Sequence, residues 1–335
     1  MTRGTDKLKK HRLLKMKLFL TGATGFLGQA LTRRFISKDI DLVLLVRKHS
    51  AKISDKAEQI VDELSDFINN PLVARKALNI DTVIHTAARA HVMDDEVPDP
   101  YTEYRKVNTE ATLALAWLAA NAGVKRFVFV SSIKVNGETT QEGSAFTEDV
   151  VVVPTDPYGL SKYEAEQGLL TIGEQTGMEV VIIRPPLIYG PGVKGNFANM
   201  IKWVKKGIPL PLGAVHNKRS LVAVDNLVDF IALCADRERS PNAANQVFLM
   251  ADSDDVSTTT LLQKVAHAQG LSPRLVPIPV GLMRLVARLL GKNDVIERLF
   301  CNLQIDSSKA QELLGWQPIT TMDQQLQKMF QDDNK

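Results

Sequence analysis

Cysteine is scarce in this chain, and its scarcity argues against several classes of protein. Of the 335 residues, only Cys234 and Cys301 are cysteines. They lie far apart and have neither the spacing of a metal site nor the density of a disulfide-stabilised secreted domain. His85 and His91 likewise have no further ligand at metal-binding spacing. We therefore expect two reduced thiols in a cytoplasmic protein that binds no metal.

Long apolar segments are also missing. A membrane-spanning helix needs about 20 consecutive apolar residues, whereas the longest run here, Leu113 to Ala120, is far shorter. We therefore predict no membrane span. One amphipathic segment, 280–290, could be a helix on a membrane surface or a helix packed on the protein, and we favour the second interpretation. Its apolar stripe comprises Val280, Met283, Val286, Ala287 and Leu290.

The net charge of +3 is distributed unevenly. Residues 1–15 carry six basic side chains and one acidic side chain, a charge of +5, which leaves −2 for the rest of the chain. We interpret 1–15 as a disordered basic tail that precedes the fold. Because the remainder is slightly acidic, the pI of about 8.7 does not indicate nucleic-acid binding.

A glycine-rich sequence, TGATGFLG, follows the apolar run at 16–20 and precedes a helical pattern of apolar residues. Strand, glycine turn and helix together are the context that a dinucleotide-binding fingerprint requires. Its glycines let the backbone approach a pyrophosphate, which then lies at the helix N-terminus. We predict that this loop binds the cofactor through Gly22, Thr24, Gly25, Phe26, Leu27 and Gly28.

The end of the second predicted strand bears on the choice between NAD and NADP. Folds that prefer NAD usually place an acidic residue there for the ribose 2′-hydroxyl. This chain has Val46, Arg47 and Lys48 instead. Arg47 could bind a 2′-phosphate or belong to a solvated basic turn. The sequence therefore slightly favours NADP over NAD.

Tyr158 and Lys162 are four residues apart, directly after Asp156 and Pro157. Pro157 suits the first turn of a helix, and Asp156 can cap it. The spacing places the phenol and the ammonium on one helix face. A neighbouring cation would lower the pKa of Tyr158 and allow the phenolate to act as a base.

Strand and helix patterns alternate as far as about residue 183, which predicts a parallel sheet with helices on both faces. We expect strands at 16–20, 41–46, 81–86, 126–131 and 179–184, and a less regular one near Ile60 and Val61. Helices are predicted near 225–236, 257–269 and 280–290. Segments 219–230 and 246–250 resemble a strand-helix return to the sheet.

The order of these motifs resembles the extended short-chain dehydrogenase/reductase superfamily, specifically its NAD-dependent epimerase/dehydratase family. Further landmarks are VIHTAA, VNTEAT, FVFVSS, RPPLIYGPG, RSLVAVDNLVDF and ELLGWQP. The resemblance implies an α/β fold, a Rossmann-type doubly wound parallel sheet over 16–184 with the return near 219–250. It also implies a smaller carboxy-terminal substrate-binding lobe, mainly 185–330, and a homodimer.

The same resemblance assigns roles to particular residues. Its catalytic serine, tyrosine and lysine fall on Ser132, Tyr158 and Lys162. Further cofactor contacts fall on Glu63 and Leu64, the nearest match to an Asp-Leu pair beside the adenine, and on Ala87 and Ala88.

Two departures from the family pattern narrow the reaction. The 4,6-dehydratases carry Thr-Asp-Glu where this chain has Ser132, Ile133 and Lys134, so dehydration is not expected. The common Val-Tyr-Gly is replaced by Val135, Asn136 and Gly137, which removes an aromatic ring from the pocket edge. Lys134 could contact a substrate phosphate or remain solvated.

What remains is hydride transfer at a sugar hydroxyl or ketone. The resemblance implies a 4-epimerase or a 4-keto reductase acting on a UDP-hexose or UDP-N-acetylhexosamine, in surface polysaccharide biosynthesis. Arg219 suits the substrate diphosphate because a guanidinium matches phosphate geometry, and Asn196 is a candidate contact on the uridine side. A non-catalytic, dinucleotide-sensing protein on the same fold is the alternative.

Overall fold

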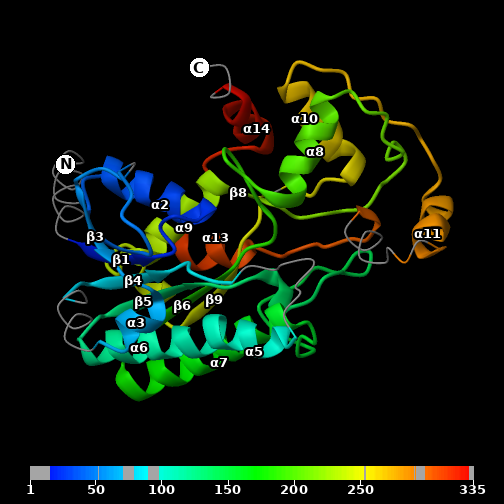
Figure 1. Cartoon of the computed structure of the whole chain (residues 1–335). Helices are drawn as coiled ribbons and strands as arrows, with labels where there is room; N and C mark the ends of the chain where they lie inside the picture. The colour runs from blue at the N-terminus through cyan, green and yellow to red at the C-terminus, as the bar shows by residue number, and fades with distance from the viewer. Residues whose placement is uncertain are drawn as a thin grey trace.

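A seven-stranded parallel sheet forms the centre of the computed structural model (Figure 1). The structure describes residues 16–51, 53–70, 79–89, 98–252, 254–289, 291 and 299–331, so the predicted tail at 1–15 lies outside it. The strands occur in the order β3-β2-β1-β4-β5-β6-β9. Their bounds are β1 Lys17–Thr21, β2 Asp41–Val46, β3 Ala57–Val61, β4 Thr82–His85, β5 Arg126–Val130, β6 Glu179–Arg184 and β9 Gln246–Leu249.

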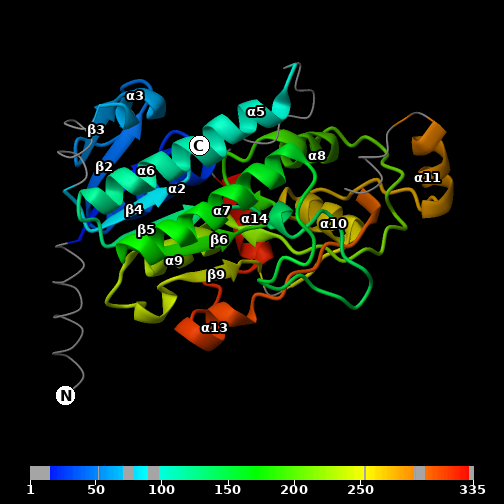
Figure 2. The same cartoon turned by 90° about the horizontal axis from the view of Figure 1, so that it is seen from below.

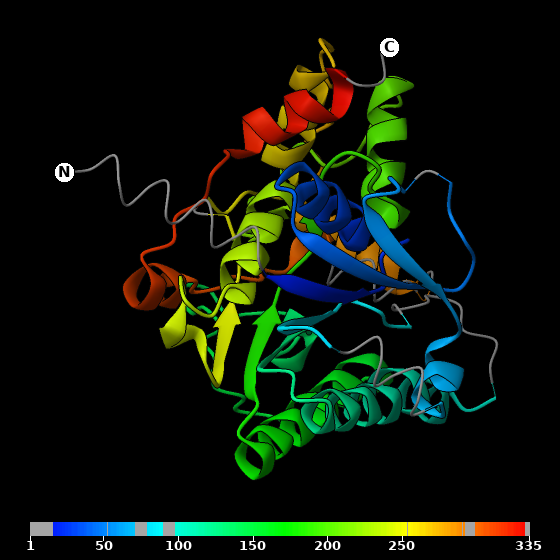
Figure 3. The same cartoon turned by 90° about the vertical axis from the view of Figure 1, so that its left-hand side faces the viewer.

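Helices cover both faces of this sheet, as Figure 3 shows. One layer contains α2 (Phe26–Ser37) and α9 (Val224–Ala235), and the other contains α3 (Leu64–Ile68), α6 (Ala111–Asn121) and α7 (Pro157–Thr176). The chain therefore has the three-layer α/β architecture that the alternating pattern predicts.

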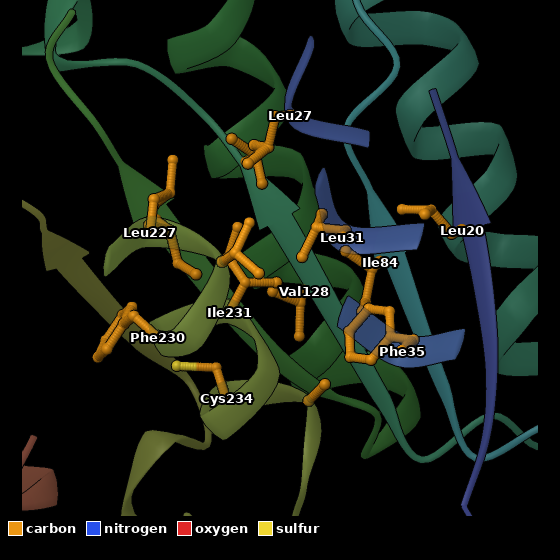
Figure 4. Packing of buried hydrophobic residues seen from close by; sticks show 14 of the residues in the cluster. Leu20, Leu27, Leu31, Phe35, Ile84, Val128, Leu227, Phe230, Ile231 and Cys234 are labelled. Carbon is orange, nitrogen blue, oxygen red and sulfur yellow. The ribbon is translucent and has the colours of Figure 1, made fainter. Parts of the chain in front are cut away.

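The strands are buried on both faces because each supplies apolar side chains to two cores. Along β1, Leu18 and Leu20 pack with α2 and α9, whereas Phe19 packs with the opposite layer. Figure 4 shows the first core, where α2 and α9 bring their apolar faces together over the strands. Ring packing adds to it, because Phe230 makes edge contacts with both Phe248 and Trp316.

A third apolar core lies in the smaller lobe. Its side chains come from residues that follow β6 in the sequence. Its elements include β7 (Ile188–Tyr189) paired with β8 (Val222–Ala223), α8 (Gly195–Lys205), α10 (Thr258–Ala268), α11 (Val280–Leu289) and α14 (Met322–Gln331). Helix α13 (Ser308–Leu314) packs instead near β9. The remaining short helices are α5 (Pro100–Tyr104), η1 (Arg105–Glu110), η2 (Ile133–Val135) and η3 (Pro241–Ala243).

The sequence predicted most of this sheet within one or two residues, including the strand near Ile60 and Val61, which is β3. The predicted return is confirmed for β9, which pairs in parallel with β6. It is wrong for β8, which pairs with β7 in a separate two-stranded sheet. Within the described residues, no helix is both long enough and apolar enough to cross a membrane.

Candidate active site

The glycine loop between β1 and α2 leaves no room for side chains at two of its three glycines. Gly22 adopts φ +75°, and a Cβ there would lie 2.6 Å from the Ala87 nitrogen. A Cβ on Gly28 would lie 2.0 Å from the Gly22 carbonyl oxygen. Gly25 differs, because only the Gly22 oxygen lies within 4 Å of its Cβ position, at 3.2 Å. The loop is therefore closely packed at Gly22 and Gly28, whereas the space around Gly25 is more open.

The first turn of α2 fits an anionic group. Its N-cap, Gly25, provides no side-chain cap, and the first turn contains no acidic residue. Thr24 and Gly25 are exposed, so their backbone is accessible. Phe26 and Leu27 instead pack on the first core, which leaves mainly their backbone N–H groups for a ligand. The arrangement suits a pyrophosphate at the positive end of the helix dipole.

The sheet register changes the expectation at the end of β2. Arg47 is exposed, as a phosphate-binding side chain would be. However, the Asp62 N–H donates to the Val46 carbonyl at 3.0 Å, so an acidic residue follows the neighbouring strand β3 at this point. The backbone of an acidic residue therefore lies beside the end of β2, where the sequence of the strand itself shows only Val46, Arg47 and Lys48. The two adenine-side candidates follow at once, Glu63 as the exposed N-cap of α3 and Leu64 packed on the second core.

Asn108 connects the loop after β4 to helix α7. It is fully buried within the π-helical turn η1. Its Oδ1 accepts from the Arg89 N–H at 2.8 Å, and its Nδ2 donates to the Arg89 carbonyl and the Ser161 hydroxyl, both at 3.1 Å. Ala87 and Ala88 lie in this loop. The sequence VNTEAT indicates the family but not this role, because the burial of Asn108 in the polar segment RKVNTE is not visible in the sequence.

His85 connects the glycine loop region to α6 as a neutral imidazole. Its Nδ1 lies 2.7 Å from the Thr21 hydroxyl and its Nε2 lies 3.0 Å from that of Thr112. Because Thr112 donates to the Asn108 carbonyl, it must accept from Nε2–H. Burial, together with the charge of Lys162, lowers the pKa of His85 to about 3.

Helix α7 positions the tyrosine and lysine as predicted. Asp156 caps it by accepting from the Gly159 N–H at 3.0 Å, and Pro157 occupies its first turn. The Tyr158 phenol is hydrogen-bonded to Ser132, at the end of β5, and its ring meets Tyr104 edge-on with centroids 5.9 Å apart. Ser132 and Tyr158 are thus brought together from segments far apart in the sequence.

The side chain of Lys162 is buried in the protein and is not in solvent. Its Nζ donates to the Val130 carbonyl at 3.0 Å while lying 4.5 Å from the Phe129 ring centroid. Burial lowers the pKa of Lys162 to about 7, against the opposing effect of Glu166.

The Tyr158 pKa contradicts the expectation from sequence. Burial among protein atoms raises the pKa of Tyr158 to about 12, and the hydrogen bond from Ser132 only partly offsets this. The prediction that Lys162 lowers it is therefore wrong for the chain alone. The physical reason is that desolvation penalises both the phenolate and the ammonium in the same buried place.

Lys134 and Asn136, which depart from the family pattern near Ser132, both contact other residues of the protein. Lys134 pairs with Glu138 and lies 3.5 Å from Asp156, so it is not simply solvated. Asn136 Oδ1 accepts from Arg184 at 3.1 Å, and its Nδ2 donates to the Thr147 carbonyl at 2.7 Å. Asn136 therefore anchors the loop that follows Ser132.

A buried ion pair joins α7 to the end of β6. Arg184 Nη2 lies 2.6 Å from Glu166 Oε2, and Arg184 Nε donates to both carboxylate oxygens at 3.0 and 3.1 Å. Arg184 also donates to the Glu148 carbonyl at 2.7 Å. This pair fixes the start of the chain that leads from the sheet to the lobe.

Of the three predicted substrate residues, Ser132 follows β5, whereas Arg219 and Asn196 belong to the lobe. Arg219 donates to the Cys301 carbonyl at 3.1 Å, and no carboxylate pairs with it among the residues described. Burial lowers the pKa of Arg219. Its backbone pairs with Leu303, which packs with Ile133 next to Ser132. Asn196 is exposed in the first turn of α8. The backbone of Arg219 is thus connected through Leu303 to the segment that follows Ser132.

Comparison with known proteins agrees with this geometry. The chain matches the model of the NAD dependent epimerase/dehydratase family over residues 18–248. It is 44% identical over 312 residues to a UDP-glucose 4-epimerase of Vibrio cholerae, and the alignment covers 93% of each chain.

Solved structures share the fold at lower identity. A UDP-glucose 4-epimerase with UDP-glucose from Thermotoga maritima aligns with a TM-score of 0.74 and 22% identity, covering 96% of this chain and 100% of the other. A UDP-glucuronic acid 4-epimerase from Bacillus cereus in complex with NAD aligns with a TM-score of 0.74 and 19% identity, covering 94% and 98%.

Proposed function

The chain belongs to the NAD-dependent epimerase/dehydratase family, and from this premise we propose that it is a UDP-sugar 4-epimerase that uses NAD. The observation that carries the proposal is the Ser132–Tyr158–Lys162 set beside a glycine loop shaped for a dinucleotide. The identity with the Vibrio cholerae protein supports a UDP-hexose such as UDP-glucose as the substrate.

The cofactor would be held by groups already described. The pyrophosphate would lie at the first turn of α2, and the nicotinamide ribose would lie near Tyr158 and Lys162. When bound, NAD supplies the acceptor for a hydride from the sugar carbon and then returns it.

Proton transfer falls to Tyr158. The phenolate accepts the proton of the 4-hydroxyl, while Ser132 donates a hydrogen bond to the same sugar oxygen as its bond to carbon becomes double. In the chain alone Lys162 does not lower the Tyr158 pKa, so we propose that protonated Lys162 stabilises the phenolate only in the complex with cofactor and substrate. After the keto sugar has turned over within the site, so that the opposite face of its carbonyl carbon would accept the hydride, Tyr158 returns the proton to the 4-oxygen.

Two alternatives are less well supported. Dehydration needs carboxylates next to Ser132, where the chain has Ile133 and a Lys134 that is already paired. A 4-keto reductase would share the catalytic residues, and in the sequence it is slightly favoured by Arg47, through a preference for NADP, and by the Ile133–Lys134 pair. Asp62, beside the end of β2, weakens the argument from Arg47.

Substrate binding is proposed for the lobe. Arg219 would bind the diphosphate, because a largely buried guanidinium with no paired carboxylate among the described residues favours an anionic ligand. Asn196 would contact the uridine side. We further propose, as the resemblance implies, a homodimer that acts in surface polysaccharide biosynthesis.

The test is to denature the purified protein and identify the nucleotide that it releases. An epimerase regenerates its cofactor in each cycle, so we expect tightly held NAD. Release of NADP, or a protein that binds NADPH in preference to NAD, would instead support the reductase.

A further inference from the structure

Helix α11 is apolar on two opposite faces. Val280, Met283 and Ala287 pack against the lobe core, which confirms the predicted packing for these three residues of the stripe. The prediction is wrong for Val286, which is 48% exposed, and Leu290 lies outside the described residues. The outer face remains in solvent, and four large apolar side chains lie on it with high exposed fractions, namely Leu282 at 54%, Leu285 at 55%, Val286 at 48% and Leu289 at 79%. Their spacing of three and four residues makes one continuous stripe. Nothing in the described chain covers this stripe, although it is as apolar as a core-facing one.

Positive charge predominates in two segments that contribute to the lobe, 185–224 and 256–293, although Asp294 and Glu297 follow the second segment closely in the sequence. No aspartate or glutamate occurs in 185–224 or in 256–293, whereas lysines and arginines occur throughout both segments. Lys264 is paired with Asp323. Lys205, Lys206, Arg274 and Arg288 are exposed and form no ion pair within the described part of the chain. This local excess of cations contrasts with the slightly acidic remainder of the fold.

Backbone pairing brings the two acid-free segments together just before α11. The Leu210 N–H donates to the Arg274 carbonyl at 2.9 Å, and the Val276 N–H donates to the Leu210 carbonyl at 2.8 Å. Exposed Ile208 and Val276 therefore lie on neighbouring segments, close to the basic end of α8. Figures 1 and 2 place α11 at the end of the molecule farthest from β3, where a flat surface could reach it.

We propose that the outer face of α11 docks on an anionic phospholipid surface. An amphipathic helix with basic flanks and a leucine-rich face inserts its apolar side chains at the boundary between headgroups and acyl chains. The exposed cations would attract the negative headgroups. A second copy of this face is disfavoured as the occupant, because it would carry the same positive charge. The absence of a spanning helix among the described residues agrees with a helix that lies on a membrane.

The test is co-sedimentation of the full chain with vesicles of phosphatidylcholine, with or without one-third phosphatidylglycerol. We expect at least tenfold stronger binding to the anionic vesicles, and loss of that difference in high salt, where the Debye length falls to about 3 Å. The double substitution Leu285→Glu with Leu289→Glu should weaken binding at least tenfold. Arg288→Gln should weaken it about fivefold, as expected for one basic group near an anionic surface.

The matched control is Ile319→Glu, which changes a side chain of similar exposure, 56%, outside α11. It should bind vesicles as the unaltered chain does, and circular dichroism should show that all variants fold. Equal binding by the double variant, or no binding by the unaltered chain, would overturn the proposal. So would self-association that the double variant abolishes in the absence of lipid binding, or binding to an acidic polypeptide but not to anionic vesicles.

Discussion

At the scale of single residues, the site places three groups where their charged forms are costly. Tyr158 and Lys162 both have pKa values shifted toward their neutral forms, to about 12 and about 7. His85 is neutral as well. A site of this kind disfavours the charged forms of all three side chains until a ligand changes the local charge. The chemistry therefore depends on what binds beside Tyr158.

Tyr158→Phe removes the hydroxyl that would carry the proton and keeps the ring that packs on Tyr104. We expect epimerase turnover to fall by roughly 10²–10⁴-fold, the usual contribution of a general acid–base group. The amount of nucleotide bound should stay unchanged. Tyr163→Phe, on the same helix, is the control and should retain activity. Full activity in the Tyr158 variant would refute the mechanism.

His85 should make the fold sensitive to acid. Its folded pKa of about 3 lies below the unfolded value of 6.5, so below pH 6.5 the unfolded chain takes up a proton that the folded chain does not. Stability should therefore decrease as pH falls from 6.5 toward 3, by about 2 kcal/mol at pH 5 for this group. Urea unfolding of the chain and of His85→Gln at pH 7.5 and pH 5 measures it. An equal acid loss in both proteins would contradict the assignment.

At the scale of elements, the connections at the carboxyl edge of the sheet decide where the site lies. The β1–α2 turn, the loop after β4 and the loop after β5 all end there, and Asn108, Asn136 and Arg184 tie them to α7 or to the following chain. Buried polar groups of this kind are costly if unpaired, so they fix one loop arrangement.

Gly28→Ala tests the shape of the cofactor loop. A methyl group there would lie 2.0 Å from the Gly22 oxygen, so the backbone of the loop would have to move to relieve the clash. We expect NAD affinity to fall at least tenfold, measured by titration calorimetry. Gly281→Ala, where nothing lies within 4 Å of the new methyl group, should bind NAD normally. Normal NAD affinity in the Gly28 variant would argue against a role of this turn in binding.

Glu166→Gln tests the link between α7 and β6. It would leave Arg184 buried without its charge partner, which typically costs about 3–5 kcal/mol of folding free energy. Glu164→Gln on the same helix is the control, because its pair with Arg105 is solvent-exposed and should contribute about 1 kcal/mol or less. Denaturant unfolding of both variants gives the comparison, and equal losses would show that burial of the Arg184 pair is unimportant.

At the scale of the whole molecule, the sequence specified the sheet better than the lobe. Strands β2 and β6 match their predicted ranges, because parallel strands buried on both faces are continuous apolar runs. The lobe was harder, since β8 consists of only two residues, Val222 and Ala223, and its partner lies more than 30 residues earlier. Pairing of that kind leaves no periodic signal in the sequence.

The candidate site divides in the same way. Spacing and resemblance identify Ser132, Tyr158 and Lys162 as candidates in the sequence, and residue type identifies Arg219. The pKa values, the pairing of Lys134, and the nearness of Asp62 to the end of β2 were not predictable. They depend on burial and on sheet register, which bring together groups that are distant in the sequence.

The most direct test of the whole account is turnover of UDP-galactose by the purified protein with no nucleotide added. We predict conversion to UDP-glucose at a steady rate, because NAD that stays bound is restored in every cycle, and loss of that conversion in Tyr158→Phe. A protein that leaves UDP-galactose unchanged, or that acts on keto sugars only with consumption of added NADPH, would contradict the assignment as an epimerase.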